Sequence, residues 1–383
     1  MILGALAQHY NQLAKHCAHT RIPSIGYSYE YISYVLVLKL DGTPVQLEPW
    51  LDTSGNRPRP RKEIVPQTER TSDVKPRFLW DNSSYVFGRS SRSNRSDEEH
   101  TEFGNLHERL LNRSGDAALD AVMHFLRAWR PRHLERLPGA DTILDDGNAN
   151  IVFRLHGETR FVHQREAAQE IWGRVFGTDD VFPGVCLLDG GQAQIAKLHP
   201  VIRGVRDAQS RGSCIVSFNA NAFTSYGKVN GANAPVAADK VYAYTLALNH
   251  LLASDRQKVQ IADATTVFWA EAPSPEIAGD IEALIGLVLS GNAPDAVANA
   301  NVMMLLERIT QGRPLADIHP SLEEAGAQLH VLALSPNAAR IAIRFWHEDS
   351  FAHFAANLRQ HYFDLKIEPQ PWKTPPSVWR LLL

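Results

Sequence analysis

Residues 217–233, SFNANAFTSYGKVNGAN, hold the side chains best suited to chemistry with a nucleic acid. Asparagine amides both donate and accept hydrogen bonds, so they can read base edges or bridge phosphates. Glycines let backbone N–H groups approach a phosphate, and aromatic rings can stack or wedge against bases. The run therefore predicts contact with nucleic acid. The candidate contact residues are Asn219, Asn221, Ser225, Tyr226, Lys228, Asn230 and Asn233, with Lys197, Arg203 and Arg206 upstream of the run.

The same run also permits a purely structural interpretation. It would then be a long loop stabilised by its own turns, with Phe218 and Phe223 anchored in the core. The surrounding charge favours the first interpretation. Residues 195–228 contain five basic side chains and one acidic side chain, a net charge of +4.

A second basic segment lies earlier in the chain. Residues 57–95 contain ten basic and four acidic side chains, a net charge of +6, and mix arginine with proline, serine and asparagine. Such a loop can lay guanidinium and hydroxyl groups along phosphates, although a solvated, mobile loop is the alternative. The candidate contact residues here are Arg57, Arg59, Arg61, Lys62, Lys75, Arg77 and Asn82.

Patterns for catalysis or metal binding are weak. His16, Cys17 and His19 lack a second cluster that would complete four ligands, and His347, His353 and His361 do not have the spacing of a helical zinc pair. Cys214 lies in an apolar run, which is typical of a small buried side chain rather than a nucleophile. The acidic pairs at 145–146 and 179–180 look like turn residues, and no phosphate-binding loop or nucleophile elbow occurs. We expect no catalytic residue, no metal and no cofactor.

Composition excludes a protein that is basic over its whole surface. The 383 residues carry 39 Lys+Arg and 42 Asp+Glu, a net charge of -3, so the two basic segments must be balanced by an acidic remainder. Three widely spaced cysteines do not form a disulfide framework. The start of the chain lacks the features of a signal peptide, and no run reaches the roughly 18 apolar residues of a membrane span. We expect a cytoplasmic protein without membrane contact.

The elements that must position these residues are predicted from periodicity. Helical spacing predicts helices over 2–15, 97–136, 165–176, 236–253, 276–289, 294–311 and 351–363. β-branched and apolar runs with turn signals predict strands over 32–40, 45–51, 151–155, 160–163, 185–188, 194–198, 213–218, 259–261, 265–269, 329–334 and 340–345. Residues 78–88 are predicted to form two short strands around a turn at 81–84. The fold class is therefore α+β, with mixed or antiparallel sheets and packed helices.

We expect three segments along the chain. Residues 1–96 would form a helix and a small antiparallel β lobe with the basic loop. Residues 97–183 would be helical with one hairpin. Residues 184–383 would form an α+β main lobe that carries the asparagine-rich loop.

Five stretches carry a family resemblance in the same order along the chain. They are MILGALAQHYNQLA (1–14), FLWDNSSYVFG (78–88), residues 184–253, VQIADATTVFWAEA (259–272) and FAANLRQHYFDLKIEPQPWKTPPSVWRLL (354–382). The central pattern LHPxIxGVxxAQSxGxxxVSFNxxAFxSYG is specific. The chain resembles the large subunit of the type I-C (Dvulg subtype) CRISPR Cascade surveillance complex, the Cas8 family.

The resemblance implies a non-catalytic subunit for antiviral defence. Family members recognise the protospacer-adjacent motif in double-stranded DNA, help to open the duplex and help to recruit the helicase-nuclease. The implied partners are this target DNA, the crRNA, the subunit that binds the crRNA 5′ handle, the backbone subunits, and inhibitor proteins that act as anti-CRISPRs. Members are longer and end in a helical bundle, so the chain looks like the N-terminal portion, which fits the bare ending Leu381-Leu382-Leu383.

Two other functions stay open at this stage. A metal-dependent nuclease would need carboxylates that converge on two cations, which a sequence alone does not exclude. A scaffold subunit that contacts only protein would use the asparagine-rich loop to pack against a neighbour.

Overall fold

The computed structural model describes residues 1–15, 22–55, 57–68, 74–112, 114–141, 143, 149–176, 181–290, 298–319, 322 and 326–369. His16, Cys17, His19, the acidic pairs at 145–146 and 179–180 and the final leucines lie outside these ranges. The chain divides into two compact units: unit 1 comprises Met1–Ile22 with Phe182–Leu383, and unit 2 comprises Pro23–Val181. This division differs from the three predicted segments, because residues on both sides of position 96 share one core in unit 2 and the first helix belongs to unit 1.

Unit 2 is built on a mixed four-stranded sheet in the order β3-β2-β7-β6. Strand β2 (Tyr34–Leu38) pairs antiparallel with β3 (Pro44–Pro49) and parallel with β7 (Asn150–Leu155), which pairs antiparallel with β6 (Trp80–Asn82). All five residues of β2, YVLVL, are buried, as expected for a strand covered on both faces. A second sheet has the order β1-β5-β4, with β1 (Tyr27–Ile32), β5 (Arg59–Pro66) and β4 (Leu51–Asp52).

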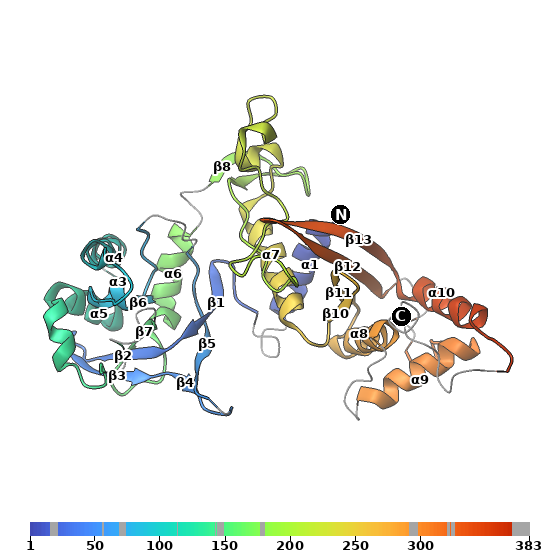
Figure 1. The fold of residues 1–383 in the computed structure, drawn as a ribbon, viewed down its shortest axis with the longest axis horizontal. Helices are drawn as coiled ribbons and strands as arrows, with labels where there is room; N and C mark the ends of the chain where they lie inside the picture. The colour runs from blue at the N-terminus through green and yellow to red at the C-terminus, as the bar shows by residue number, and fades with distance from the viewer. Residues whose placement is uncertain are drawn as a thin grey trace. The chain divides into compact units, whose positions relative to one another are not determined.

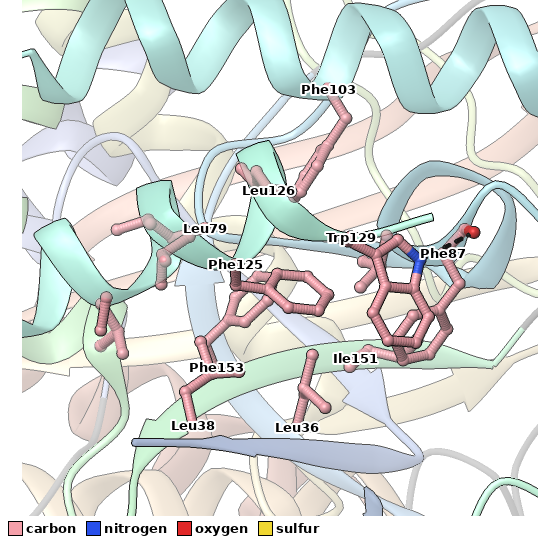
Figure 2. Close-up of a cluster of buried hydrophobic side chains, with 14 of the residues drawn as sticks. Leu36, Leu38, Leu79, Phe87, Phe103, Phe125, Leu126, Trp129, Ile151 and Phe153 are labelled. Atoms are coloured by element: carbon pink, nitrogen blue, oxygen red, sulfur yellow. Dashed lines mark hydrogen bonds between the residues drawn. The ribbon is translucent and has the colours of Figure 1, made fainter. Parts of the chain in front are cut away.

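Helices pack on the mixed sheet to close the core of unit 2. They are α3 (Ser83–Phe87), α4 (Ser96–Leu111), α5 (Ala117–Ala128) and α6 (Glu166–Val175), with 3-10 turns η1 (Pro131–Arg136) and η2 (Val162–Gln164). Figure 2 shows Phe125 and Trp129, at the end of α5, above the side chains of Leu36 and Phe153 from the sheet. The buried indole N–H of Trp129 donates to the Phe87 carbonyl at 3.1 Å, which satisfies the polar atom of the ring.

Unit 1 combines a helix pair with an antiparallel sheet (Figure 1). Helix α1 (Ile2–Lys15) packs against α7 (Ala238–Ala253) through buried Leu6 and Tyr10 on one side and Tyr244 and Leu248 on the other. The sheet runs β10-β11-β12-β13: β10 (Lys258–Ile261), β11 (Ala264–Glu271), β12 (Gln328–Asn337) and β13 (Arg340–Ser350). The remaining elements are β8 (Val181–Val185), β9 (Gln192–Ala196), α8 (Pro275–Ser290), α9 (Ala298–Gln311), α10 (Phe351–Asp364), and 3-10 turns η3 (Asn221–Phe223) and η4 (Asn230–Asn233).

The predicted α+β class is confirmed, but three local predictions are wrong. Residues 78–88 form β6 followed by helix α3, because Asn82 caps the helix and Gly88 ends it in the left-handed region at φ +70°. Residues 160–163 make one isolated bridge to Arg154 and then enter η2. Residues 213–218 form no strand and make only single bridges at Ser213 and Cys214. Among the described helices, none combines the length and apolar character that a membrane span requires.

Candidate nucleic-acid interface

The asparagine-rich run forms an exposed loop of unit 1, between β9 and α7. Every side chain from Asn219 to Asn230 is exposed, including Tyr226 at 99% and Phe223 at 41%. Phe218 is half-buried, whereas Phe223 is exposed. The structural alternative, in which both phenylalanines are anchored in the core, is therefore wrong for Phe223. In Figure 1 the yellow-green segment between β9 and α7 extends away from the sheet of unit 1. Large aromatic groups are therefore held in solvent, where a partner can reach them.

The tip of this loop is a tight turn centred on Tyr226 and Gly227. The Lys228 N–H donates to the Ser225 carbonyl at 2.9 Å, and the two central residues have φ +52° and φ +72°. Positive φ at both central positions defines a type I′ turn, which glycine and asparagine normally occupy. A tyrosine in the left-handed region costs roughly 1–2 kcal/mol. In this strained conformation the whole Tyr226 side chain is exposed to solvent.

Asn233 fastens the turn to the rest of the loop. Its side-chain oxygen accepts from the Ser225 N–H at 3.1 Å, and its Nδ2 donates to the carbonyls of Lys228 and Asn230, each at 3.1 Å. One amide therefore ties together three points of the backbone. This asparagine, a candidate contact residue by sequence, holds the loop in shape, and its amide already has partners within the loop.

The C-terminal end of the loop docks on the end of β9. Gly231 is buried and its N–H donates to the Lys197 carbonyl at 2.8 Å. A Cβ atom at this position would lie 2.1 Å from the Ala196 carbonyl oxygen, so only glycine permits this approach. The contact places the backbone of Lys197 beside the loop.

Arg340 supports the other end of the loop and adds a cation that sequence reasoning missed. Its Nη2 donates to the Asn219 side-chain oxygen at 2.6 Å, and its Cζ lies 4.5 Å from the centre of the Phe223 ring. Arg340 is the first residue of β13, and the backbone on either side of it bonds to Cys214. The Cys214 N–H donates to the Ala339 carbonyl, and the Ile341 N–H donates to the Cys214 carbonyl at 2.9 Å. No local pattern could reveal this contact, because 121 residues separate Arg340 from Asn219.

Several side chains of the loop are available for an external partner. Among the residues that the structure describes, the amides of Asn221 and Asn230, the hydroxyls of Ser225 and Tyr226 and the Lys228 ammonium have no hydrogen-bond or ion-pair partner. The other upstream candidates are exposed: Arg206 pairs with Asp207 at 3.6 Å, and the backbone of Arg203 donates to Asn249 at 2.8 Å. The loop thus presents an amide, an aromatic ring and a cation together.

The first basic segment belongs to unit 2 and is more ordered than predicted. Arg61 and Lys62 lie in β5, where the Arg61 guanidinium stacks on Trp50 at 4.6 Å and the Lys62 ammonium on Tyr29 at 4.3 Å. The Arg61 Nε also donates to the Leu51 carbonyl at 2.9 Å. These contacts fix two of the cations on the sheet. The other candidates of this segment, Arg57, Arg59 and Lys75, are exposed.

Arg77 and Asn82 serve the fold of unit 2. The Arg77 side chain is 19% exposed, pairs with Asp81 at 3.3 Å and stacks on Trp80 at 4.3 Å. The Asn82 oxygen accepts from the Ser84 N–H at 3.1 Å and from its hydroxyl at 2.6 Å, as an N-cap does. Both residues are engaged by neighbours in their own unit, and the sequence had suggested contact with DNA for each.

Metal-binding geometry is absent from the part of the chain that the structure describes: no group of three or more His, Cys, Asp or Glu is placed to hold an ion. His347 and His353 both approach Asp349, at 3.6 and 2.5 Å, on the surface of unit 1. Cys214 is half-buried.

Comparison with known proteins identifies the family. Residues 6–383 match the sequence model of the family described as CRISPR-associated protein (Cas_Csd1). The chain belongs to this family. The match supports a Cascade-type CRISPR protein, in agreement with the resemblance seen in the sequence. The comparison with curated proteins finds no match.

Proposed function

We propose that this chain is the non-catalytic DNA-recognition subunit of a type I-C crRNA-guided surveillance complex, the Cas8 family. In this proposal it corresponds to the N-terminal portion of that subunit and recognises the protospacer-adjacent motif in duplex DNA. The observation that carries the proposal is the exposed loop of unit 1, which presents Asn221, Tyr226 and Lys228 on a scaffold fixed by Asn233 and Arg340.

Three of the available groups suit three tasks on a duplex. The Asn221 amide has the donor and acceptor needed to pair with a base edge in a groove. The Lys228 ammonium neutralises a phosphate, which makes affinity depend on salt. The Tyr226 ring can enter between base pairs and unstack them, which starts the opening of the duplex. The rest of the target sequence is read by pairing with the RNA, so the loop needs to read only a short motif.

The proposal includes the partners that the family resemblance implies. The chain would assemble in the cytoplasm with crRNA, the subunit that holds its 5′ handle and the backbone subunits, and would help to recruit the helicase-nuclease. Its near-neutral total charge fits this role, because the partners hold the RNA and only a local surface needs to bind DNA.

Replacing Asn221 with alanine tests base readout. In the assembled complex, we expect Asn221→Ala to weaken binding to a duplex that carries the motif by about fivefold to 150-fold, because a good base contact contributes about 1–3 kcal/mol. Binding to a duplex without the motif should stay unchanged. The motif is first found by selection from a randomised library, and affinity is measured by electrophoretic mobility shift. Asn105→Ala, an exposed asparagine on α4, is the matched control.

Two outcomes would overturn the proposal. Equal losses on duplexes with and without the motif would show that Asn221 does not read bases. Cleavage of labelled DNA or RNA by the purified chain with Mg²⁺ or Mn²⁺ would show that the subunit is an enzyme, since we expect no cleavage.

A further inference from the structure

Unit 2 brings together two arginine-rich segments that are far apart in the sequence. The indole N–H of Trp129 bonds to the Phe87 carbonyl at 3.1 Å, so the start of η1 lies against the end of α3. The Arg89 guanidinium reaches Glu135 at 3.6 Å, and a Cβ on Gly88 would meet the ring of Pro131 at 3.0 Å. We call the exposed arginines of these two segments the arginine surface. They are Arg89, Arg92, Arg95, Arg130, Arg132 and Arg136.

The arginine surface has an excess of positive charge. Residues 88–95, GRSSRSNR, contain three arginines and no acidic residue, and residues 130–136 contain three arginines and only Glu135. Asp97, Glu98 and Glu99 follow in the first turn of α4, so six arginines face four acidic residues. Arg89 already pairs with Glu135. Within the described ranges, Arg92, Arg132 and Arg136 are exposed and form no ion pair. An anionic partner would therefore be attracted to this patch.

Short turns hold the loop of the arginine surface in shape. The Ser90 hydroxyl accepts from the Arg92 N–H at 3.1 Å, and the Ser93 hydroxyl accepts from the Arg95 N–H at 3.2 Å. The Ser93 hydroxyl also donates to Glu99 at 2.9 Å, which ties the loop to α4. Arginines on a fixed loop lose less conformational entropy when they bind a phosphate chain.

A cavity of about 360 Å³ adjoins the arginine surface. Its lining includes Phe125, Trp129 and His133, together with Arg136 and Asp41. The backbone N–H of Thr43 bonds to the Asp41 carboxylate and lowers its pKa, so this carboxylate is ionised at neutral pH. An ionised carboxylate accepts a hydrogen bond from the amino group of cytosine. Arg136 belongs to both the cavity and the arginine surface.

We propose that unit 2 binds a single strand of nucleic acid, with its phosphates on the arginine surface and one unpaired base in the cavity beside Arg136. The charge attracts the phosphate chain, and the half-open cavity can admit an unpaired base, because a base within a duplex is stacked and paired. The site lies wholly in unit 2 and does not rest on the loop of unit 1. It therefore goes beyond recognition of a duplex motif.

Binding of labelled single strands to the full chain tests the arginine surface. Fluorescence anisotropy is measured with RNA and DNA strands of one sequence and with the matching DNA duplex, at several salt concentrations. For the double variant Arg132→Ala with Arg136→Ala, the salt slope should fall by about 1.4, and affinity at 0.1 M salt should fall by about tenfold or more. The control is Arg109→Ala with Arg174→Ala, two exposed arginines elsewhere in unit 2. An unchanged slope in the double variant, or an equal loss of strand and duplex binding in it, would overturn the proposal.

A second variant tests the cavity without a change of charge. Ala128 is an exposed residue of its lining, so Ala128→Phe should fill the cavity and leave the core intact, as thermal unfolding would verify. We expect about fivefold weaker binding of a strand with bases and no change for an abasic strand. An equal effect on both strands would overturn the base pocket. Preference for RNA or for DNA would identify the source of the strand. Asn221→Ala should not alter any of these results, so failure here leaves the function of the unit 1 loop untouched.

Discussion

Asn233→Ala would release the turn that presents Tyr226 and Lys228. The asparagine makes three hydrogen bonds of 3.1 Å to the loop backbone. Because these bonds are near solvent, each contributes about 0.5 kcal/mol, the lower end for a neutral hydrogen bond. Their loss would shift the balance between ordered and open loop by about 1.5 kcal/mol, which is about tenfold in population. The core of unit 1 lies elsewhere, so the melting temperature should change little.

Hydrogen exchange on the full chain measures this shift directly. In Asn233→Ala, the amides of Ser225 and Lys228 should exchange up to about tenfold faster, and the assembled complex should bind its motif duplex up to about tenfold more weakly. Asn221→Ala should leave exchange unchanged, because its side chain holds no part of the loop. Equal exchange in Asn233→Ala and the parent chain would refute the idea that Asn233 fixes the loop.

Three further predictions concern charge, pH and packing. Arg340→Ala should weaken binding to any duplex and reduce the salt slope by about 0.9, whereas Arg340→Lys keeps the slope; no change in the alanine variant would exclude a phosphate contact. Burial in the core lowers the pKa of His107 to about 4. In the neutral form its Nε2 accepts from the Leu79 N–H at 2.9 Å, a bond that protonation would break. The folded pKa lies below the unfolded value of 6.5, so unit 2 should lose about 3 kcal/mol between pH 6.5 and 4, and His107→Gln should reduce that loss in denaturant titrations. Gly42→Ala should lower the stability of unit 2 by at least about 2 kcal/mol, because the residue has φ +83° and the new Cβ would lie 2.6 Å from the Phe125 nitrogen; an unchanged melting temperature would contradict this.

Regular amphipathic elements could be predicted from the sequence because their signal is local. Helix α1 was predicted over its observed range, and α7 differs from the prediction by two residues at its start. The hairpin of β2 and β3 follows from a buried run and the turn at 41–44. In each case one face of apolar side chains and a turn residue are sufficient.

Other parts of the fold could not be predicted because they depend on which strands pair in the folded chain. Strand β5 is rich in arginine and lysine, so its sequence resembles a loop, and it becomes a strand because β1 pairs along it and aromatic rings support its cations. Residues 213–218 look like a strand, but β13 offers a pairing position only at Cys214. Neither outcome is visible in the local sequence.

The sequence predicted which residues belong to the candidate site, but it did not predict the role of each residue. Asn219, Asn221 and Asn233 look alike in the sequence. In the structure one is held by Arg340, one is available and one fastens the turn. Asn219 is held by a residue 121 positions away in the sequence, and Asn233 bonds to a left-handed turn at Tyr226 and Gly227. Tyrosine is rare at positive φ, so its place at the tip of the turn could not be anticipated.

Photocrosslinking from the loop tip tests the central claim most directly. Tyr226 is 99% exposed, so a benzoylphenylalanine at this position should preserve the fold. In the assembled complex with a motif-bearing duplex, we expect crosslinks to nucleotides at or beside the motif, and their loss when the motif is removed. Crosslinks only to a neighbouring protein subunit, with or without the motif, would contradict DNA recognition by this loop.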